Sequence, residues 1–173
     1  MQGIGDVWEM AADKWEDVFS QLGDDDWDKP TPCDGWTVRE LVEHAMFWQG
    51  RGAMVFGSPV AEDADWAVLR AALAGALADP SNLEGVVEQM GGAPKAAVAG
   101  LVTTDLLVHS WDLARAIGVD ETLPEAAAAS TMMGLQRMPD EMLRREGMFG
   151  PAVAVADDAS AQDKLIAFVG RQP

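Results

Sequence analysis

Three side chains that could bind a metal ion lie in two short stretches of the sequence. Asp105 and His109 are four residues apart, and His44 is the other histidine of the chain. On a helix, side chains four positions apart share one face, with Cβ atoms about 5–6 Å apart, so Asp105 and His109 can converge on one cation. Two imidazoles and one carboxylate form the ligand set of catalytic zinc and of non-haem iron(II) sites.

The helix predicted over residues 95–117 carries polar side chains where apolar ones are expected. Asp105, His109 and Asp112 lie within its apolar stripe rather than on the opposite face. An ionised carboxylate that faces a core without a partner costs several kcal/mol. The pattern predicts that a cation satisfies Asp105 and His109, or that the two form a buried pair. The stripe consists of Val98, Leu101, Val102, Val108, Leu113 and Ala116.

Other residues near these positions have both structural and functional interpretations. Asp112 could orient a ligand imidazole or act as a fourth ligand, or it could pair with Arg115 or satisfy a helix end. Trp48 is one helical turn from His44 and is predicted to form a wall of the pocket. Cys33 precedes a helix N-terminus, where a thiolate is favoured, but a small buried residue that holds its loop is the simpler interpretation.

The helices that must position these residues follow from apolar periodicity and from local start and stop signals. A capping box of Thr37 and Glu40 begins the helix of His44, and this role explains Glu40 more simply than a ligand role does. Gly118 is the expected C-cap of the helix over 95–117, and Pro139 should kink or break the helix that follows. Helices are predicted over about 5–22, 37–56, 61–78, 95–117, 124–145 and 160–169, with an irregular or extended connection at 82–94.

These elements predict an all-α protein: a four-helix bundle with a short extra C-terminal helix. In such a bundle, His44 can face Asp105 and His109 across the core. The length of 173 residues and the even composition indicate a single domain over residues 1–173. Methionines on the predicted helix over 124–145 indicate core filling or a helix–helix interface, with a homodimer face as the alternative.

The composition also limits the partners and the compartment. Lys and Arg total 12 and Asp and Glu total 29, a net charge of -17 that repels nucleic acid and favours a neutral or cationic small-molecule substrate. No apolar run approaches the roughly 20 residues of a membrane span. The first residues lack a basic region followed by an apolar stretch, so we expect no signal peptide. The single cysteine fits a reducing cytoplasm.

Two stretches of the chain resemble the signatures of a known family. Residues 31–44, TPCDGWTVRELVEH, and residues 105–118, DLLVHSWDLARAIG, are similar to those of the mycothiol-dependent maleylpyruvate isomerase family, within the DinB-like superfamily. The segments Phe149–Pro151 and Gly170–Arg171 are similar to those of a short, single-domain actinobacterial branch.

This resemblance implies a metal-binding four-helix bundle in which His44, Asp105 and His109 hold a divalent metal, zinc or nickel. It also implies a low-molecular-weight thiol as co-substrate. Two departures limit the comparison. The isomerases have Glu at the position of Asp105, and they carry a second, C-terminal domain for which this chain has no room. The isomerase reaction is therefore not carried over.

Three hypotheses for the function follow. The first is a metal-dependent enzyme that activates water or a thiol towards a small electrophile, as a hydrolase or a thiol S-transferase. The alternative is a non-catalytic bundle that binds a metal or a small ligand. The third is a metal-free module that binds a partner, with Asp105 and His109 as a buried pair, which leaves His44 unexplained.

Overall fold

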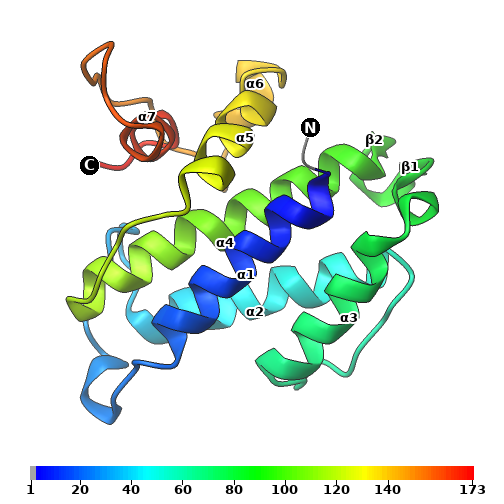
Figure 1. The fold of residues 1–173 in the computed structure, drawn as a ribbon, viewed down its shortest axis with the longest axis horizontal. Coiled ribbons are helices and arrows are strands. Elements are labelled where there is room, and N and C mark those ends of the chain that lie inside the picture. The colour runs from blue at the N-terminus through cyan, green and yellow to red at the C-terminus, as the bar shows by residue number, and fades with distance from the viewer. Residues whose placement is uncertain (1–2) are drawn as a thin grey trace. The chain divides into compact units, whose positions relative to one another are not determined.

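The computed structural model describes residues 3–173 and consists mainly of helices (Figure 1), which confirms the predicted all-α class. Met1 and Gln2 belong to the segment in which we expect no signal peptide, and they lie outside the described residues. None of the helices in the described part is long and apolar enough to cross a membrane. The helices are α1 (Ile4–Phe19), α2 (Val38–Val55), α3 (Trp66–Ala78), α4 (Lys95–Ile117), α5 (Glu125–Leu135), α6 (Asp140–Leu143) and α7 (Ala161–Phe168).

The chain forms two compact units. The first ends at Glu121 and holds α1 to α4, and the second begins at Thr122 and holds α5 to α7. Every residue predicted for the site lies in the first unit. The single domain over residues 1–173 stays a prediction.

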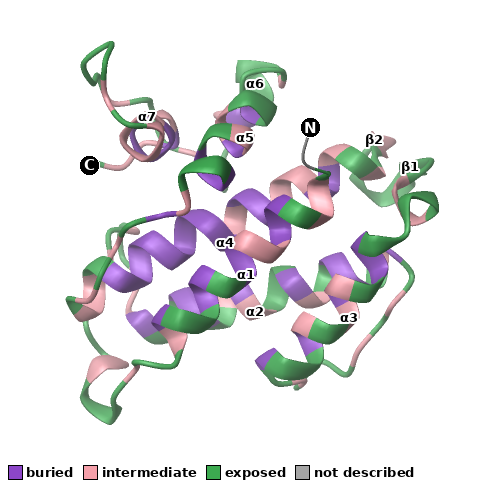
Figure 2. Ribbon diagram, in the orientation of Figure 1, coloured by how far each residue is buried: buried purple, intermediate pink, exposed green. Residues whose placement is uncertain are grey.

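The first unit is a four-helix bundle organised around α4. Helix α4 packs along α1 and α2, and α3 packs against α2 and α1. Long stretches of α4 are buried (Figure 2), which fits a helix that is covered on more than one face. The largest completely buried side chains of this unit are Trp8, Trp15, Trp111, Phe56, Leu41, Leu73, Leu106, Leu107 and Leu113.

Local signals set the ends of the two helices that carry the predicted ligands. At the start of α2, the Glu40 carboxylate accepts hydrogen bonds from the backbone N–H and the hydroxyl of Thr37 at 2.7 and 2.8 Å. The Thr37 hydroxyl oxygen in turn accepts from the Glu40 N–H at 3.4 Å. Gly118 ends α4 with a left-handed φ of 78°, which a residue with a side chain rarely adopts. The predicted capping box and C-cap are both confirmed.

A buried polar contact and a close approach set α2 against α4. The Gln49 side chain accepts a hydrogen bond from the Trp8 indole at 3.0 Å and donates one to the Val102 carbonyl at 3.1 Å, which links α1, α2 and α4. A Cβ added at Gly52 would lie 3.1 Å from Val102. Position 52 of α2 therefore meets 102 of α4, and position 44 meets 105, so the two helices run antiparallel.

The connections differ from the sequence prediction in two places. Helix α3 begins at Trp66 rather than near residue 61, because the Asp65 side chain caps the Val68 N–H at 3.0 Å. Helix α1 ends at Phe19 rather than near residue 22, and the Ser20 hydroxyl donates a hydrogen bond to the Asp17 carbonyl at that end. The connection over 82–94 is irregular and extended as predicted, with short 3₁₀ turns and two antiparallel strands, β1 (Val86–Val87) and β2 (Ala93–Pro94).

The second unit contains the helices that the sequence predicted beyond residue 123. Helix α5 ends at Leu135, and Pro139 immediately precedes α6, so the predicted helix over 124–145 is interrupted near Pro139 as expected. Helix α5 packs against α7. Ser160 caps α7, since its hydroxyl accepts a hydrogen bond from the Asp163 N–H at 3.0 Å.

Candidate metal centre

His44, Asp105 and His109 lie together where α2 crosses α4. One oxygen of Asp105 lies 3.0 Å from Nε2 of His44 and 3.5 Å from Nε2 of His109. One donor atom from each of the three residues lies within 4.8 Å of the others. His44 lies two turns into a capped helix, and Asp105 and His109 lie one turn apart on the facing helix. The structure therefore brings together the three residues that the sequence selected.

The second carboxylate considered for the site, Asp112, contacts the other nitrogen of His109. Its Oδ2 accepts a hydrogen bond from Nδ1 of His109 at 2.9 Å, and its side chain is completely buried. A proton on Nδ1 leaves the Nε2 lone pair of a neutral imidazole directed at Asp105. Asp112 thus contacts the imidazole on the edge opposite Asp105.

Burial and neighbouring charges shift the pKa values of Asp105 and His109 in opposite directions. Burial raises the pKa of Asp105, but the charges and hydrogen bonds of His109 and His44 outweigh it, and the pKa of Asp105 is lowered. Burial likewise lowers the pKa of His109, but Asp105, Asp112 and Cys33 outweigh it, and this pKa is well above its usual value. In the absence of a cation, these neighbours therefore favour the protonated form of His109.

One polar atom of the cluster lacks a hydrogen-bond partner. Within the described residues, Oδ2 of Asp105 is buried and accepts no hydrogen bond, an arrangement that native proteins rarely tolerate without an ion or water. Tetrahedral zinc with nitrogen and oxygen ligands at about 2.1 Å places those ligands about 3.4 Å apart. The measured separations of 3.0 and 3.5 Å lie close to that value. The donor set and its spacing therefore fit a divalent cation.

The cluster is open to solvent on one side. The side chain of His109 is 8% exposed, whereas those of Asp105 and His44 are 19% and 28% exposed. His109 thus lies deepest, and the donors of His44 and Asp105 lie nearer the surface. An exogenous ligand has access from the side of His44 and Asp105.

Tryptophans flank the histidines. The Trp36 ring lies 4.6 Å from the His44 ring and 6.0 Å from the His109 ring, measured between centroids. Trp48, predicted as a pocket wall, lies 6.3 Å from His44 and remains 37% exposed. Its role as a wall stays a prediction. Sequence reasoning missed Trp36, although its position directly before the capping box of the His44 helix was a signal for it.

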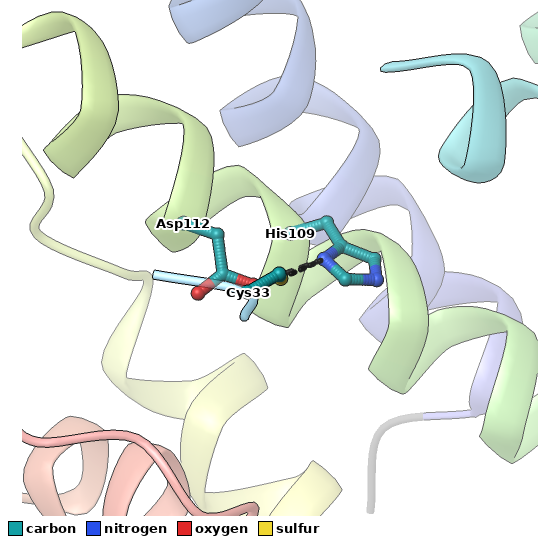
Figure 3. Close-up of side chains that lie close together, drawn as sticks. All are labelled: Cys33, His109 and Asp112. Atoms are coloured by element: carbon teal, nitrogen blue, oxygen red, sulfur yellow. Dashed lines mark hydrogen bonds and ion pairs between the residues drawn. The ribbon is translucent and has the colours of Figure 1, made fainter. Parts of the chain in front are cut away.

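Cys33 also lies at the cluster. From the sequence, Cys33 was interpreted only as a residue that holds its loop or as a reactive thiol. Its Sγ donates to Oδ2 of Asp112 at 3.3 Å and lies 3.9 Å from Nδ1 of His109 (Figure 3). The side chains of Cys33, His109 and Asp112 thus form a second cluster that shares His109 with the first.

Helices α1 to α4 form an all-α bundle with a polar cluster between α2 and α4, which is consistent with the DinB-like bundle that the resemblance implies. Residues 8–67 match the model of the mycothiol maleylpyruvate isomerase N-terminal domain, which confirms the family resemblance over those residues. The match includes His44, Trp36 and Cys33 and ends before Asp105 and His109. The ligand assignment from the sequence therefore stays a prediction.

The chain is also similar to mycobacterial proteins over nearly its whole length. It is 29% identical to an uncharacterized protein of Mycobacterium tuberculosis strain CDC 1551 / Oshkosh, over 94% of this chain and 96% of that protein. An uncharacterized protein of M. tuberculosis strain ATCC 25618 matches with the same identity and coverage. The comparison with solved structures finds no match.

Proposed function

We propose that this protein binds one divalent cation, zinc or nickel, through His44, Asp105 and His109. With that cation it activates water or a low-molecular-weight thiol towards a small electrophile. The observation that carries the proposal is the placement of the Asp105 carboxylate: its Oδ1 lies 3.0 and 3.5 Å from Nε2 of His44 and His109, and its buried Oδ2 has no hydrogen-bond partner. The similarity to the N-terminal domain of a mycothiol isomerase supports a thiol as co-substrate.

Residues around the proposed ligands orient them and hold them in place. Asp112 holds Nδ1 of His109 and so directs Nε2 towards Asp105. Trp36 packs against both imidazole rings, with centroids 4.6 Å from His44 and 6.0 Å from His109. The capping box fixes the start of α2, and the Gln49 contact holds α2 against α4, so the donors meet where the two helices cross.

The reaction classes that suit this arrangement are hydrolysis and thiol S-transfer. A divalent cation would lower the pKa of a bound water or thiol and polarise a carbonyl. Three protein donors leave a tetrahedral ion one position for an exogenous ligand, and the exposed sides of His44 and Asp105 leave access to it. The charge of -17 favours a neutral or cationic electrophile.

Metal content is the first test of the ligand set. Tag-free protein purified without chelator is analysed by elemental mass spectrometry, together with His44→Ala, His109→Ala and the control Glu43→Gln. Glu43 is an exposed neighbour of His44 on α2. We expect near-stoichiometric metal in the wild type and in the control, and loss in both histidine variants with unchanged circular dichroism. A wild type that takes up no zinc, nickel or iron(II) would refute the proposal.

A second test separates an enzyme from a binding protein. The metal-loaded protein is assayed with small electrophiles in water and with added low-molecular-weight thiols, and the exchange of water at the ion is measured by relaxation of a paramagnetic substitute. Exchangeable water and turnover that is lost in His109→Ala support the enzyme. A closed coordination sphere without turnover supports the non-catalytic alternative.

A further inference from the structure

Cys33 and His109 are hydrogen-bonded to the same carboxylate oxygen. The thiol donates to Oδ2 of Asp112 at 3.3 Å, and Nδ1 of His109 donates to that oxygen at 2.9 Å. Figure 3 shows the thiol and the imidazole converging on Asp112. Neither Cys33 nor His109 can change its contact with Oδ2 without affecting the other.

The carboxylate of Asp112 depends on such donors because it is completely buried. A buried carboxylate is stable only when hydrogen bonds replace its hydration. Removing the thiol donor weakens the restraint on the carboxylate, which can then rotate away from Nδ1 of His109. The thiol therefore affects the imidazole through Asp112.

The loop that carries Cys33 is itself held in place. The Cys33 N–H donates to the Thr31 hydroxyl at 3.2 Å, and the Cys33 carbonyl accepts from the Trp36 N–H at 3.0 Å. Gly35 permits the turn between them with a φ of 75°. Because the backbone on both sides of Cys33 is fixed, only the side-chain rotamer of Cys33 has to be ordered when its thiol contacts Asp112.

The same loop contacts the ligand histidines through Trp36, which packs on the rings of both His44 and His109. The loop over residues 30–37 therefore restrains His109 in two ways: by aromatic packing on the ring and by the thiol through Asp112. We infer that Cys33 is a positioning residue that sets the orientation of His109 through Asp112. The consequence for cation affinity rests on the proposed function.

A direct ligand role for Cys33 is the competing explanation, because its Sγ, Nδ1 of His109 and Oδ2 of Asp112 also lie within 4.8 Å of one another. A cation there would displace the proton through which Nδ1 donates to Asp112. Moreover, Oδ2 of Asp112 already accepts two hydrogen bonds, whereas the buried oxygen without a partner belongs to Asp105 in the other cluster. The distribution of satisfied and unsatisfied atoms favours the positioning role.

The first part of the experiment uses the metal-free protein, so it does not depend on metal binding. Nitrogen-15 NMR of the imidazoles is simple because the chain has two histidines, and His44→Gln assigns them. The exchange rate of the Nδ1 proton of His109 is measured in the wild type, Cys33→Ala, Cys33→Ser and Asp112→Asn. We expect exchange to rise about three- to tenfold in Cys33→Ala and to be largely restored in Cys33→Ser, which keeps a donor.

The second part measures zinc affinity by competition with a chromophoric chelator. Cys33→Ala should weaken binding about three- to tenfold, Cys33→Ser should recover most of the loss, and Cys33→Ala should add nothing in an Asp112→Asn background. Cobalt(II) spectra of the same variants show whether sulfur coordinates the ion.

Three results would overturn the inference: unchanged proton exchange in Cys33→Ala, an undiminished effect of Cys33→Ala in the Asp112→Asn background, or a wild-type thiolate-to-cobalt band that both Cys33 variants lack. If the wild type binds no metal, the proposed function fails, and the exchange rates alone decide whether Cys33 orients His109. Thermal unfolding of each variant separates a general loss of stability from this local effect.

Discussion

Asp112 and Asp105 contact opposite edges of the His109 imidazole. Oδ2 of Asp112 lies 2.9 Å from Nδ1, and Oδ1 of Asp105 lies 3.5 Å from Nε2. All three residues come from α4, spaced so that they follow one face of the helix. The more exposed carboxylate lies on the side of His44, and the completely buried one holds the far edge of the ring.

Replacing Asp112 with Asn should weaken cation binding without unfolding the bundle. The amide keeps the shape of the side chain but loses the charge that holds the Nδ1 proton of His109. Removing such a partner typically costs about 10- to 100-fold in metal affinity. Zinc competition titrations measure the change, with Glu62→Gln, an exposed acid outside the cluster, as the control. Equal affinity in the wild type and Asp112→Asn would contradict this role of Asp112.

Replacing Asp105 with Asn should weaken zinc binding at least about tenfold, because an amide nitrogen replaces one carboxylate oxygen and the negative charge is lost. Asp105→Glu is the matched comparison, since it keeps the carboxylate and adds one methylene. We expect Asp105→Glu to bind more tightly than Asp105→Asn in the same titration. The reverse order would show that the carboxylate of Asp105 is not a ligand.

Replacing Gln49 with Leu should destabilise the bundle by about 1–3 kcal/mol, because the buried Trp8 N–H loses its acceptor. Urea unfolding of the metal-free protein measures this free energy. Gln21→Leu is the control, since Gln21 is exposed and surface changes usually stay within about 0.5 kcal/mol. Similar values for the two variants would mean that the Gln49 contacts add little to the packing of α1, α2 and α4.

Replacing Thr37 with Ala should reduce the free energy of unfolding by about 0.5–2 kcal/mol, because the first turn of α2 loses its side-chain cap. Thr37→Ser keeps the hydroxyl and should recover most of that loss. Urea unfolding at neutral pH compares the three proteins. Equal losses in the Ala and Ser variants would assign the effect to the methyl group rather than to the cap.

The capping box also predicts a dependence of stability on pH. Backbone and hydroxyl hydrogen bonds from Thr37 lower the pKa of Glu40 below 4.5, its usual value. A lowered folded-state pKa contributes stability that is present above the unfolded value and is lost as the pH falls through the folded value. Wild type should therefore exceed Glu40→Gln in stability at neutral pH, and the difference should shrink below about pH 4.5.

Urea unfolding of metal-free wild type and Glu40→Gln, repeated from neutral pH down to about pH 3, tests this dependence. Taking the difference between the two proteins removes the contribution of the other acidic groups. A difference that stays constant over the whole range would show that ionisation of Glu40 does not stabilise α2.

The elements of the fold were predictable where a few neighbouring residues decide them. The start of α2 depends on Thr37 and Glu40, three residues apart, and the end of α4 depends on Gly118. The predicted start of α3 is about five residues early, because Ala61 and Ala64 were included in the alanine-rich segment although acidic residues lie between and after them. The helix begins at Trp66 because the carboxylate of Asp65 caps its first turn by accepting a hydrogen bond from the Val68 N–H.

Within the site, the residues selected from the sequence lie on helical faces, and the structure brings them together, whereas the loop contacts were not predicted. His44, Asp105 and His109 stood out because their spacing and their apolar surroundings are local properties. The contacts of Trp36 with the histidines, and of Cys33 with Asp112 at a separation of 79 residues, depend on how the loop over residues 30–37 folds over α4. Local periodicity contains no information on that arrangement.

The sequence by itself determined the helices, their caps, and the presence of two imidazoles and two carboxylates on apolar helix faces, because these features depend on residues within about four positions of one another. The tertiary structure decided that His44 meets Asp105 across 61 residues and that Cys33 contacts the Asp112 carboxylate across 79 residues. The contact of His44 with Asp105 depends on the crossing of α2 with α4, which the close fit of Gly52 to Val102 and the buried Gln49 set together. The contact of Cys33 depends on how the loop over residues 30–37 packs on α4.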